Sequence, residues 1–228
     1  MLSSFHSHDT VLWAQLTMNV VTDLRGGLLL QFDARENPVV HVKVGLSSVS
    51  TQHARANLDH EIADWDVNAA RQRTLARWDD YLGRVAVNGG TTAQTQAFYS
   101  ALYRVFLQPA IWSDVDGSYF GFDQQPHPGD GRAHYANFSG WDIYRSWIQL
   151  VALLAPVETS DMVRSLILDG QQGGALPKWA YGASETGVMI GDPADAIIAN
   201  AWAFGARDFD AAAALALMKH GATDPDAA

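Results

Sequence analysis

The helical stretches after residue 91 constrain the fold more than any other feature, because they are joined alternately by long and by very short connections. Apolar periodicity and end signals predict five helices, over 93–108, 140–154, 159–170, 192–204 and 208–220. The connections 155–158 and 205–207 are tight, whereas 110–139 and 171–191 are long. Tight connections make consecutive helices antiparallel, so the second and fourth helices point the same way. Both long loops are then expected on one face, where function usually sits.

The helix over 192–204 has the clearest end signals. Asp192 is a candidate N-cap, Pro193 fits the first helical position, and Gly205 stands where a left-handed residue commonly ends a helix. The third helix is predicted to open at Thr159 or Ser160.

The N-terminal part has a different pattern. Val40, Val42 and Val44 alternate with polar residues after a turn at 37–38, which predicts a half-buried strand. Two or three short strands need a partner layer, so we expect residues 1–50 to be the end of a β domain. Residues 51–90 are polar with an apolar stripe of helical spacing, which predicts a helical linker, and residues 91–228 begin the helical domain.

Composition narrows the function. The chain has 228 residues and a formal net charge of −10, so nucleic acid is a poor partner, and no stretch is long and apolar enough for membrane insertion. There are no cysteines, which excludes disulfides and thiolate metal sites. Aromatic residues make up 11% and many stand beside Gly, Asp and Gln after residue 98, a mixture that suits carbohydrate. The alternative is that these aromatics fill a helical core.

The first candidate site lies in "NFSGWDIYRSW", at the end of the first long loop. Ser139 and Asp142 have the spacing of a capping box, and Asp142 can pair with Arg145 one turn later. Trp141 and Asp142 would place an aromatic face and a carboxylate at the mouth of a helix, where they could hold a sugar ring. The alternative is that Asp142 only caps the helix.

The second candidate site is Glu185, within "GGALPKWAYGASETGVMIGDPADA". A carboxyl group surrounded by Trp179, Tyr181, Met189 and Ile190 would be partly desolvated and would stay protonated near neutrality. Such a group can donate a proton to a leaving oxygen. The alternative is that Glu185 caps the following loop or pairs with Lys178.

Three weaker signals carry no prediction of a site. The stretch "DVDGSYFG" at 114–121 resembles part of a calcium loop, but a turn explains it better because further ligands and the terminal Glu are missing. His6 and His8 could chelate a metal, although a chain terminus explains them more simply. No phosphate-binding Gly-rich motif occurs.

Three separated segments resemble glycoside hydrolase family 92, the calcium-dependent exo-acting α-mannosidases, in the order that the family has them. They are "VHVKVGLSSVSTQHARANLDHEI", "NFSGWDIYRSWIQLVALLAP" and "QQGGALPKWAYGASETGVMIGDPADAIIANAWAFGARDFD". The resemblance implies the last strands of an N-terminal β-sandwich over 1–50, a helical linker over 51–90, and the first part of an (α/α)6 toroid over 91–228. It also implies hydrolysis of terminal mannose from N-glycans or mannans with inversion, and a full-length protein that is secreted or periplasmic.

The resemblance also implies residue roles. Glu185 matches the general acid, Trp141 and Asp142 match the pocket for the terminal mannose, Arg145 orients Asp142, and Trp179 lines the pocket. The general base and the calcium-binding acids of the family are expected beyond residue 228, so the fragment alone is expected to be inactive. Ser184 and the Asp192-Pro193 pair depart from the family pattern, which leaves the linkage preference open.

Other classes remain open on sequence alone. A carbohydrate-binding module would need the aromatic lining but not Glu185. A non-catalytic helical scaffold would need neither. Among enzymes, other (α/α)6 hydrolases that act on glucosides or trehalose are the nearest alternatives.

Overall fold

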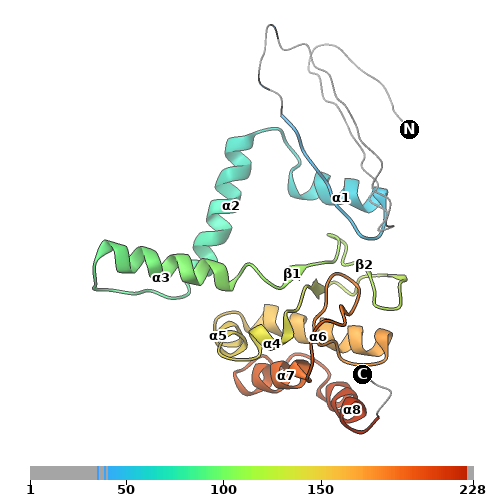
Figure 1. Ribbon diagram of the computed structural model, residues 1–228. Coiled ribbons are helices and arrows are strands. Elements are labelled where there is room, and N and C mark those ends of the chain that lie inside the picture. The colour runs from blue at the N-terminus through green and yellow to red at the C-terminus, as the bar shows by residue number, and fades with distance from the viewer. Residues whose placement is uncertain (1–34, 36–38, 40, 225–228) are drawn as a thin grey trace.

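The computed structural model describes residues 35, 39 and 41–224, and it is mainly helical. Figure 1 shows the helices in chain order: α1 (Thr51–Glu61), α2 (Val67–Leu82), α3 (Thr92–Val105), α4 (Gly140–Ile143), α5 (Trp147–Leu154), α6 (Pro156–Gly173), α7 (Pro193–Ala203) and α8 (Ala211–Thr223). None of the helices in the described part combines the length and the apolar character that crossing a membrane requires.

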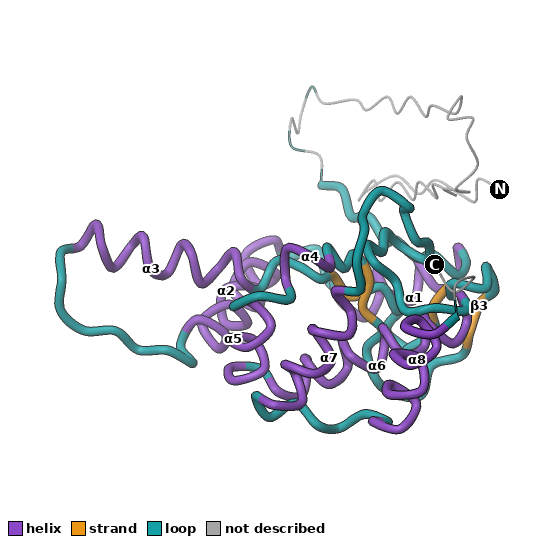
Figure 2. Tube along the Cα trace, turned by 60° about the horizontal axis from the view of Figure 1, so that its bottom comes forward, coloured by secondary structure: helices purple, strands orange, loops and turns teal. Residues whose placement is uncertain are grey.

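The core lies where α5, α6 and α7 pack against one another. Each helix turns an apolar face inward, and most of the apolar side chains buried there are aliphatic; they include Ile148, Val151, Val163, Leu166 and Ile197. Helix α8 packs on the outer side of α6, while α2 and α3 extend away from this cluster (Figures 1 and 2). The cluster is therefore the rigid base on which both long loops stand.

The predicted N-terminal strand is wrong as far as the structure describes it. Val40 and most of residues 1–50 lie outside the described residues, and residues 41–50 contain no strand. Val42 and Val44 are 71% and 66% exposed, because no partner strand among the described residues covers them.

The linker is helical as predicted, but it consists of two helices. Ile62 ends α1 with a non-helical backbone, and the carboxylate of Asp66 accepts from the N–H groups of Asn68 and Ala69 to begin α2. An Asp at this position favours a new helix start over continuation, since it satisfies two otherwise unpaired donors. The break therefore follows from an N-cap that the apolar stripe alone does not reveal.

The predicted helix over 140–154 is also divided, at residues 144–146. Ser146 has φ +60, which a regular α-helix does not contain, so α4 is a single turn and α5 begins afresh at Trp147. Helix α6 starts earlier than predicted, with Pro156 in its first turn. The hydroxyls of Thr159 and Ser160 donate to carbonyls one turn back and do not open the helix.

The first long loop contains two short antiparallel pairs that sequence periodicity could not show. Strand β1 (Ala110–Ile111) pairs with β4 (Tyr135–Ala136), and β2 (Tyr119–Phe120) pairs with β3 (Pro126–His127). Two-residue strands are too short for a period-two pattern. The pairs fold the loop back on itself, so that its end reaches the start of α4.

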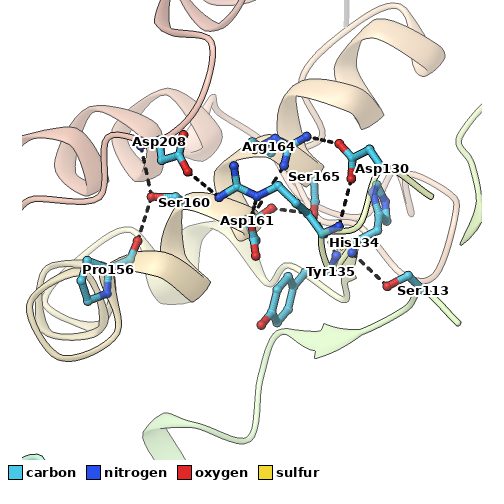
Figure 3. A network of polar contacts seen from close by, with 11 residues as sticks. Ser113, Asp130, His134, Tyr135, Pro156, Ser160, Asp161, Arg164, Ser165 and Asp208 are labelled. Atoms are coloured by element: carbon cyan, nitrogen blue, oxygen red, sulfur yellow. Dashed lines mark hydrogen bonds and ion pairs between the residues drawn. The ribbon is translucent and has the colours of Figure 1, made fainter. Parts of the chain in front are cut away.

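Polar side chains of α6 hold this loop and the turn before α8 (Figure 3). Buried Ser165 accepts from the backbone N–H of Tyr135 at 2.8 Å, and Ser160 accepts from that of Asp208 at 3.3 Å. The guanidinium of Arg132 bridges Asp161 of α6, at 2.6 Å, and Asp208, at 2.7 Å. Burial raises the pKa of Asp161 despite this cation, whereas the hydrogen bond from Arg132 lowers the pKa of Asp208.

A second polar contact on α6 is buried. Asp169 and His134 have side chains that are 2% and 5% exposed, with Oδ1 and Nε2 3.2 Å apart in an orientation too poor for a hydrogen bond. The ring of Tyr119 stacks on His134 with centroids 3.9 Å apart. Desolvation raises the pKa of Asp169, and the contact with His134 only partly opposes it.

The prediction that both long loops share one face is confirmed. Gly140, the first residue of α4, lies so close to Pro193, the first residue of α7, that an added Cβ would stand 2.5 Å from the proline Cγ. The same Cβ would stand 2.2 Å from the carbonyl oxygen of Lys178. The two helices therefore begin side by side, with the ends of both loops in contact.

Candidate active site

The ends of the two long loops are joined by one chain of hydrogen bonds. The indole N–H of Trp179 donates to the hydroxyl of Ser139, and that hydroxyl donates to Oδ2 of Asp142. The backbone N–H of Trp179 donates to Oε2 of Glu185 at 3.0 Å. The structure thus brings together Asp142, Trp179 and Glu185, which the sequence places up to 43 positions apart.

Glu185 is held by backbone donors on both sides. Oε2 accepts from the N–H groups of Lys178, at 2.6 Å, and Trp179, at 3.0 Å, while Oε1 accepts from that of Gly187 at 2.9 Å. A single bridge between Ala180 and Glu185 closes this turn of the loop. The carboxylate therefore organises the loop that carries it, which is the role that the sequence left open as the alternative.

The predicted apolar environment of Glu185 is wrong for this structure. Glu185 is exposed, and Ile190 and Tyr181 are 89% and 69% exposed. The apolar side chains that follow Glu185 point outward because the backbone around it turns through Gly182, Gly187 and Gly191, all with positive φ. Glu185 is therefore exposed in a loop that also exposes apolar side chains.

The residues predicted to bind sugar are accessible. Trp141 is 51% exposed, and Asp142 is exposed in the first turn of α4. The capping box predicted at Ser139 is wrong, because its hydroxyl is engaged by Trp179 and Asp142 and caps no backbone N–H. Arg145 donates to the hydroxyl of Tyr144 at 2.8 Å, and makes no ion pair with Asp142 in the described part of the chain.

The first long loop also supports the second at positions that sequence reasoning missed. The side-chain oxygen of Asn137 accepts from the N–H of Gly182 at 2.9 Å, and the amide of Gln124 donates to the carbonyl of Ala183 at 2.8 Å. Asn137 has φ +67, a conformation that Asn tolerates better than most residues. No motif marks these two amides, since amide side chains are common in loops.

Asp195 is a further carboxylate that sequence reasoning did not single out. It lies in the first turn of α7 and lines a small cavity together with Lys178 and Asp192. Burial, and then the charge of Asp192, raises the pKa of Asp195. Asp192 itself makes no side-chain cap, although Pro193 and Gly205 occupy the positions predicted for them.

A larger cavity, of about 410 Å³, lies between α2, the end of α3, α5 and α6. Its lining is mainly apolar and aromatic, with Arg77 and Glu158 as the charged members. None of the lining residues belongs to the loop that carries Glu185. A lining of this kind is typical of a gap between packed elements. The candidate site is therefore the hydrogen-bonded group around Ser139.

Comparisons with known proteins show which family the sequence resembles. The model of the glycosyl hydrolase family 92 catalytic domain matches residues 53–228, which include every residue of the candidate site. No match was found among curated proteins.

Solved structures give the same result. A family GH92 α-mannosidase from Bacteroides thetaiotaomicron is 29% identical, with a TM-score of 0.73 over 78% of this chain and 24% of its own. That protein in complex with mannoimidazole gives a TM-score of 0.74 at 28% identity, over 79% of this chain and 24% of its own. A GH92 inverting mannosidase from the same organism is 32% identical, with a TM-score of 0.71 over 76% and 24%. The chain thus spans about a quarter of the length of these relatives.

Proposed function

Since the chain belongs to glycosyl hydrolase family 92, we propose that it is part of an exo-acting α-mannosidase that releases terminal mannose with inversion. The observation that carries this proposal is the chain of hydrogen bonds from Asp142 through Ser139 and Trp179 to Glu185. It holds two exposed carboxylates in one hydrogen-bonded group, and we assign one to a sugar and the other to the leaving group. Similar proteins are named as α-mannosidases, one of them as inverting.

We assign Trp141 and Asp142 to the terminal mannose. The half-exposed ring of Trp141 offers a flat apolar surface on which a sugar ring can stack. Asp142 already accepts one hydrogen bond, at Oδ2, and Oδ1, which accepts none from the described residues, can accept from sugar hydroxyls. Arg145 is exposed beside them and would reach the sugar or its aglycone.

Glu185 is the general acid in this proposal. Oε2 accepts from two backbone donors, whereas Oε1 accepts the N–H of Gly187 at 2.9 Å and has only a long contact, of 3.5 Å, with the hydroxyl of Thr186. Oε1 is therefore the oxygen that would carry the proton and give it to the leaving oxygen. A general acid within reach contributes on the order of 10² to 10⁴ in rate.

The general base is not assigned to a described residue. An inverting glycosidase needs a second carboxyl roughly 6.5–9.5 Å from the acid, with a water between them. Asp142 holds sugar hydroxyls in this proposal, so it cannot also activate that water. The base is expected in the part of the relatives that this chain does not span.

Calcium, which the family implies, does not fit the described part of this site. Calcium takes six to eight oxygen ligands, and the described side chains here offer only the carboxylates of Asp142 and Glu185, the second of which is held by backbone donors. No step is assigned to calcium through these residues.

The test compares two substrates in the whole protein that contains this chain. Glu185→Gln should slow hydrolysis of a mannobiose by about 10² to 10⁴ and slow a dinitrophenyl mannoside much less, because dinitrophenolate leaves without protonation. Equal slowing of both substrates would make Glu185 a binding or loop-organising residue, as in a carbohydrate-binding protein.

Asp195→Asn is the matched control. This carboxylate lies close to the same loop and has a raised pKa, but it is not bonded to the chain of contacts at Trp179. The variant should keep the ratio of the two rates near that of the unsubstituted enzyme. A selective loss on mannobiose in Asp195→Asn, with none in Glu185→Gln, would transfer the acid role to Asp195.

A further inference from the structure

The linker helix α1 meets the turn 114–117 at a group of three side chains suited to binding a metal ion. His53 of α1, Asp114 and Asp116 each present one ligand atom, and these atoms all lie within 4.8 Å of one another. The sequence had shown only the two carboxylates of an Asp-x-Asp-Gly turn. The structure adds an imidazole from 61 positions upstream of Asp114.

We propose that His53, Asp114 and Asp116 form a binding site for a divalent transition-metal ion such as Zn²⁺ or Mn²⁺. Nε2 of His53 lies 3.4 Å from Oδ2 of Asp116. Two ligands at about 2.1 Å from one tetrahedral ion stand roughly 3.4 Å apart, so this pair already has the required separation. Asp116 is exposed, so its side chain can rotate to bring all three ligands to one ion.

Groups outside the three ligands hold two of them in place. The buried carboxylate of Asp114 accepts from Asn57 at 2.6 Å and from Ser47 at 2.7 Å, which leaves a lone pair on each oxygen. Nδ1 of His53 lies 2.6 Å from the hydroxyl of Ser50. When Nε2 binds an ion, the ring proton is on Nδ1, where Ser50 accepts it, as the outer partners of metal-bound histidines do.

The local charge also favours a cation. Asp114 is 6% exposed and stands beside a second carboxylate, and in the described part of the chain neither makes an ion pair with Lys or Arg. A buried carboxylate is costly unless it is paired or binds a metal. The imidazole favours Zn²⁺ over Ca²⁺, because a nitrogen ligand suits Zn²⁺ whereas Ca²⁺ prefers oxygen, and the two carboxylates are ligands that also suit Mn²⁺.

The experiment is calorimetric titration of the chelator-treated protein with Zn²⁺, and electron paramagnetic resonance with Mn²⁺ as the second probe. We expect one equivalent to bind, and binding to weaken in acid because the imidazole must be neutral. His53→Gln and Asp116→Asn should each lower the affinity by at least about 10-fold, and Ser50→Ala by about 10- to 100-fold.

His127→Gln is the control, since His127 contacts one carboxylate, Asp123 at 2.9 Å, and belongs to no group of three. It should bind Zn²⁺ as the unsubstituted protein does. The unfolding midpoint of each variant, measured in chelator, shows whether that variant is folded. If His53→Gln is not folded, Asp116→Asn provides the test in its place. The proposal fails if the unsubstituted protein binds no ion, if folded His53→Gln binds Zn²⁺ equally well, or if Ca²⁺ binds more tightly than Zn²⁺.

Discussion

The indole N–H of Trp179 donates to the hydroxyl of Ser139, across 40 positions of sequence. This bond is one of several direct links between the loop that ends at α4 and the loop that carries Glu185. Since the same hydroxyl donates to Asp142, a substitution of Trp179 or Ser139 should alter the hydrogen bonds of both loops.

The losses of unfolding free energy caused by Trp179→Phe and by Ser139→Ala should therefore not be additive. Each removes one partner of the bond and should cost about 0.5–1.5 kcal/mol of unfolding free energy. The double variant should cost less than the sum, because the bond can be lost only once. Urea unfolding of the four proteins measures the coupling, and strictly additive costs would show that this bond contributes nothing to the stability of the protein.

Gly140→Ala should destabilise the protein by about 1–3 kcal/mol, since its Cβ would overlap the carbonyl oxygen of Lys178 and the ring of Pro193. Gly221→Ala is the matched control. Nothing lies within 4 Å of a Cβ at Gly221, inside α8, so alanine there should stabilise by up to about 1 kcal/mol. A similar effect of both substitutions on the thermal midpoint would contradict the close approach of α4 and α7.

The effect of Asp169→Asn on the free energy of unfolding should become more favourable to the folded state as pH rises. The pKa of Asp169 is raised by burial above its ordinary value of 3.8, so its stabilising contribution is fully present below that ordinary value and is lost as pH rises through the pKa of the folded protein. The side chain of Asn is neutral at every pH, so the variant loses no stability in this way. Unfolding measured at pH 4 and pH 7 should show that the stability of the variant relative to the unsubstituted protein is higher at pH 7 than at pH 4. The exposed control Asp79→Asn should show little change between the two pH values. A gain at pH 4 would reverse the sign of this account.

The chain expressed as these 228 residues should self-associate. Leu153 and Val157 are 62% and 65% exposed at the junction of α5 and α6, and Trp202 at the end of α7 is 42% exposed. Exposed apolar side chains in such number mark surfaces that another protein segment covers. Light scattering should show oligomers that Leu153→Lys with Val157→Lys reduces. A sharp monomer peak without these substitutions would contradict the prediction.

The sequence predicted the helices and the meeting of the two long loops because both follow from local signals. Pro193 and Gly205 mark ends of α7 through backbone preferences that act within one turn. The break at Ser146 and the outward course of the loop after Glu185 were missed, since they depend on contacts made by distant segments. The role of Asn137, whose side chain holds Gly182, is of the same kind. Local patterns carry no information about which distant backbone N–H an amide will meet.

The amide of Asn57 donates to the carbonyl of Leu46 and to Asp114 and accepts from the N–H of Val115 at 2.9 Å, so this one side chain ties α1 to the loop at two adjacent residues. Asn57 and Asp114 are 57 positions apart. During synthesis at about 5–20 residues per second, roughly 3 to 11 seconds pass between their emergence from the ribosome. Over that interval α1 has no docking partner in the loop, so this helix is open to proteases and chaperones while the protein is being made.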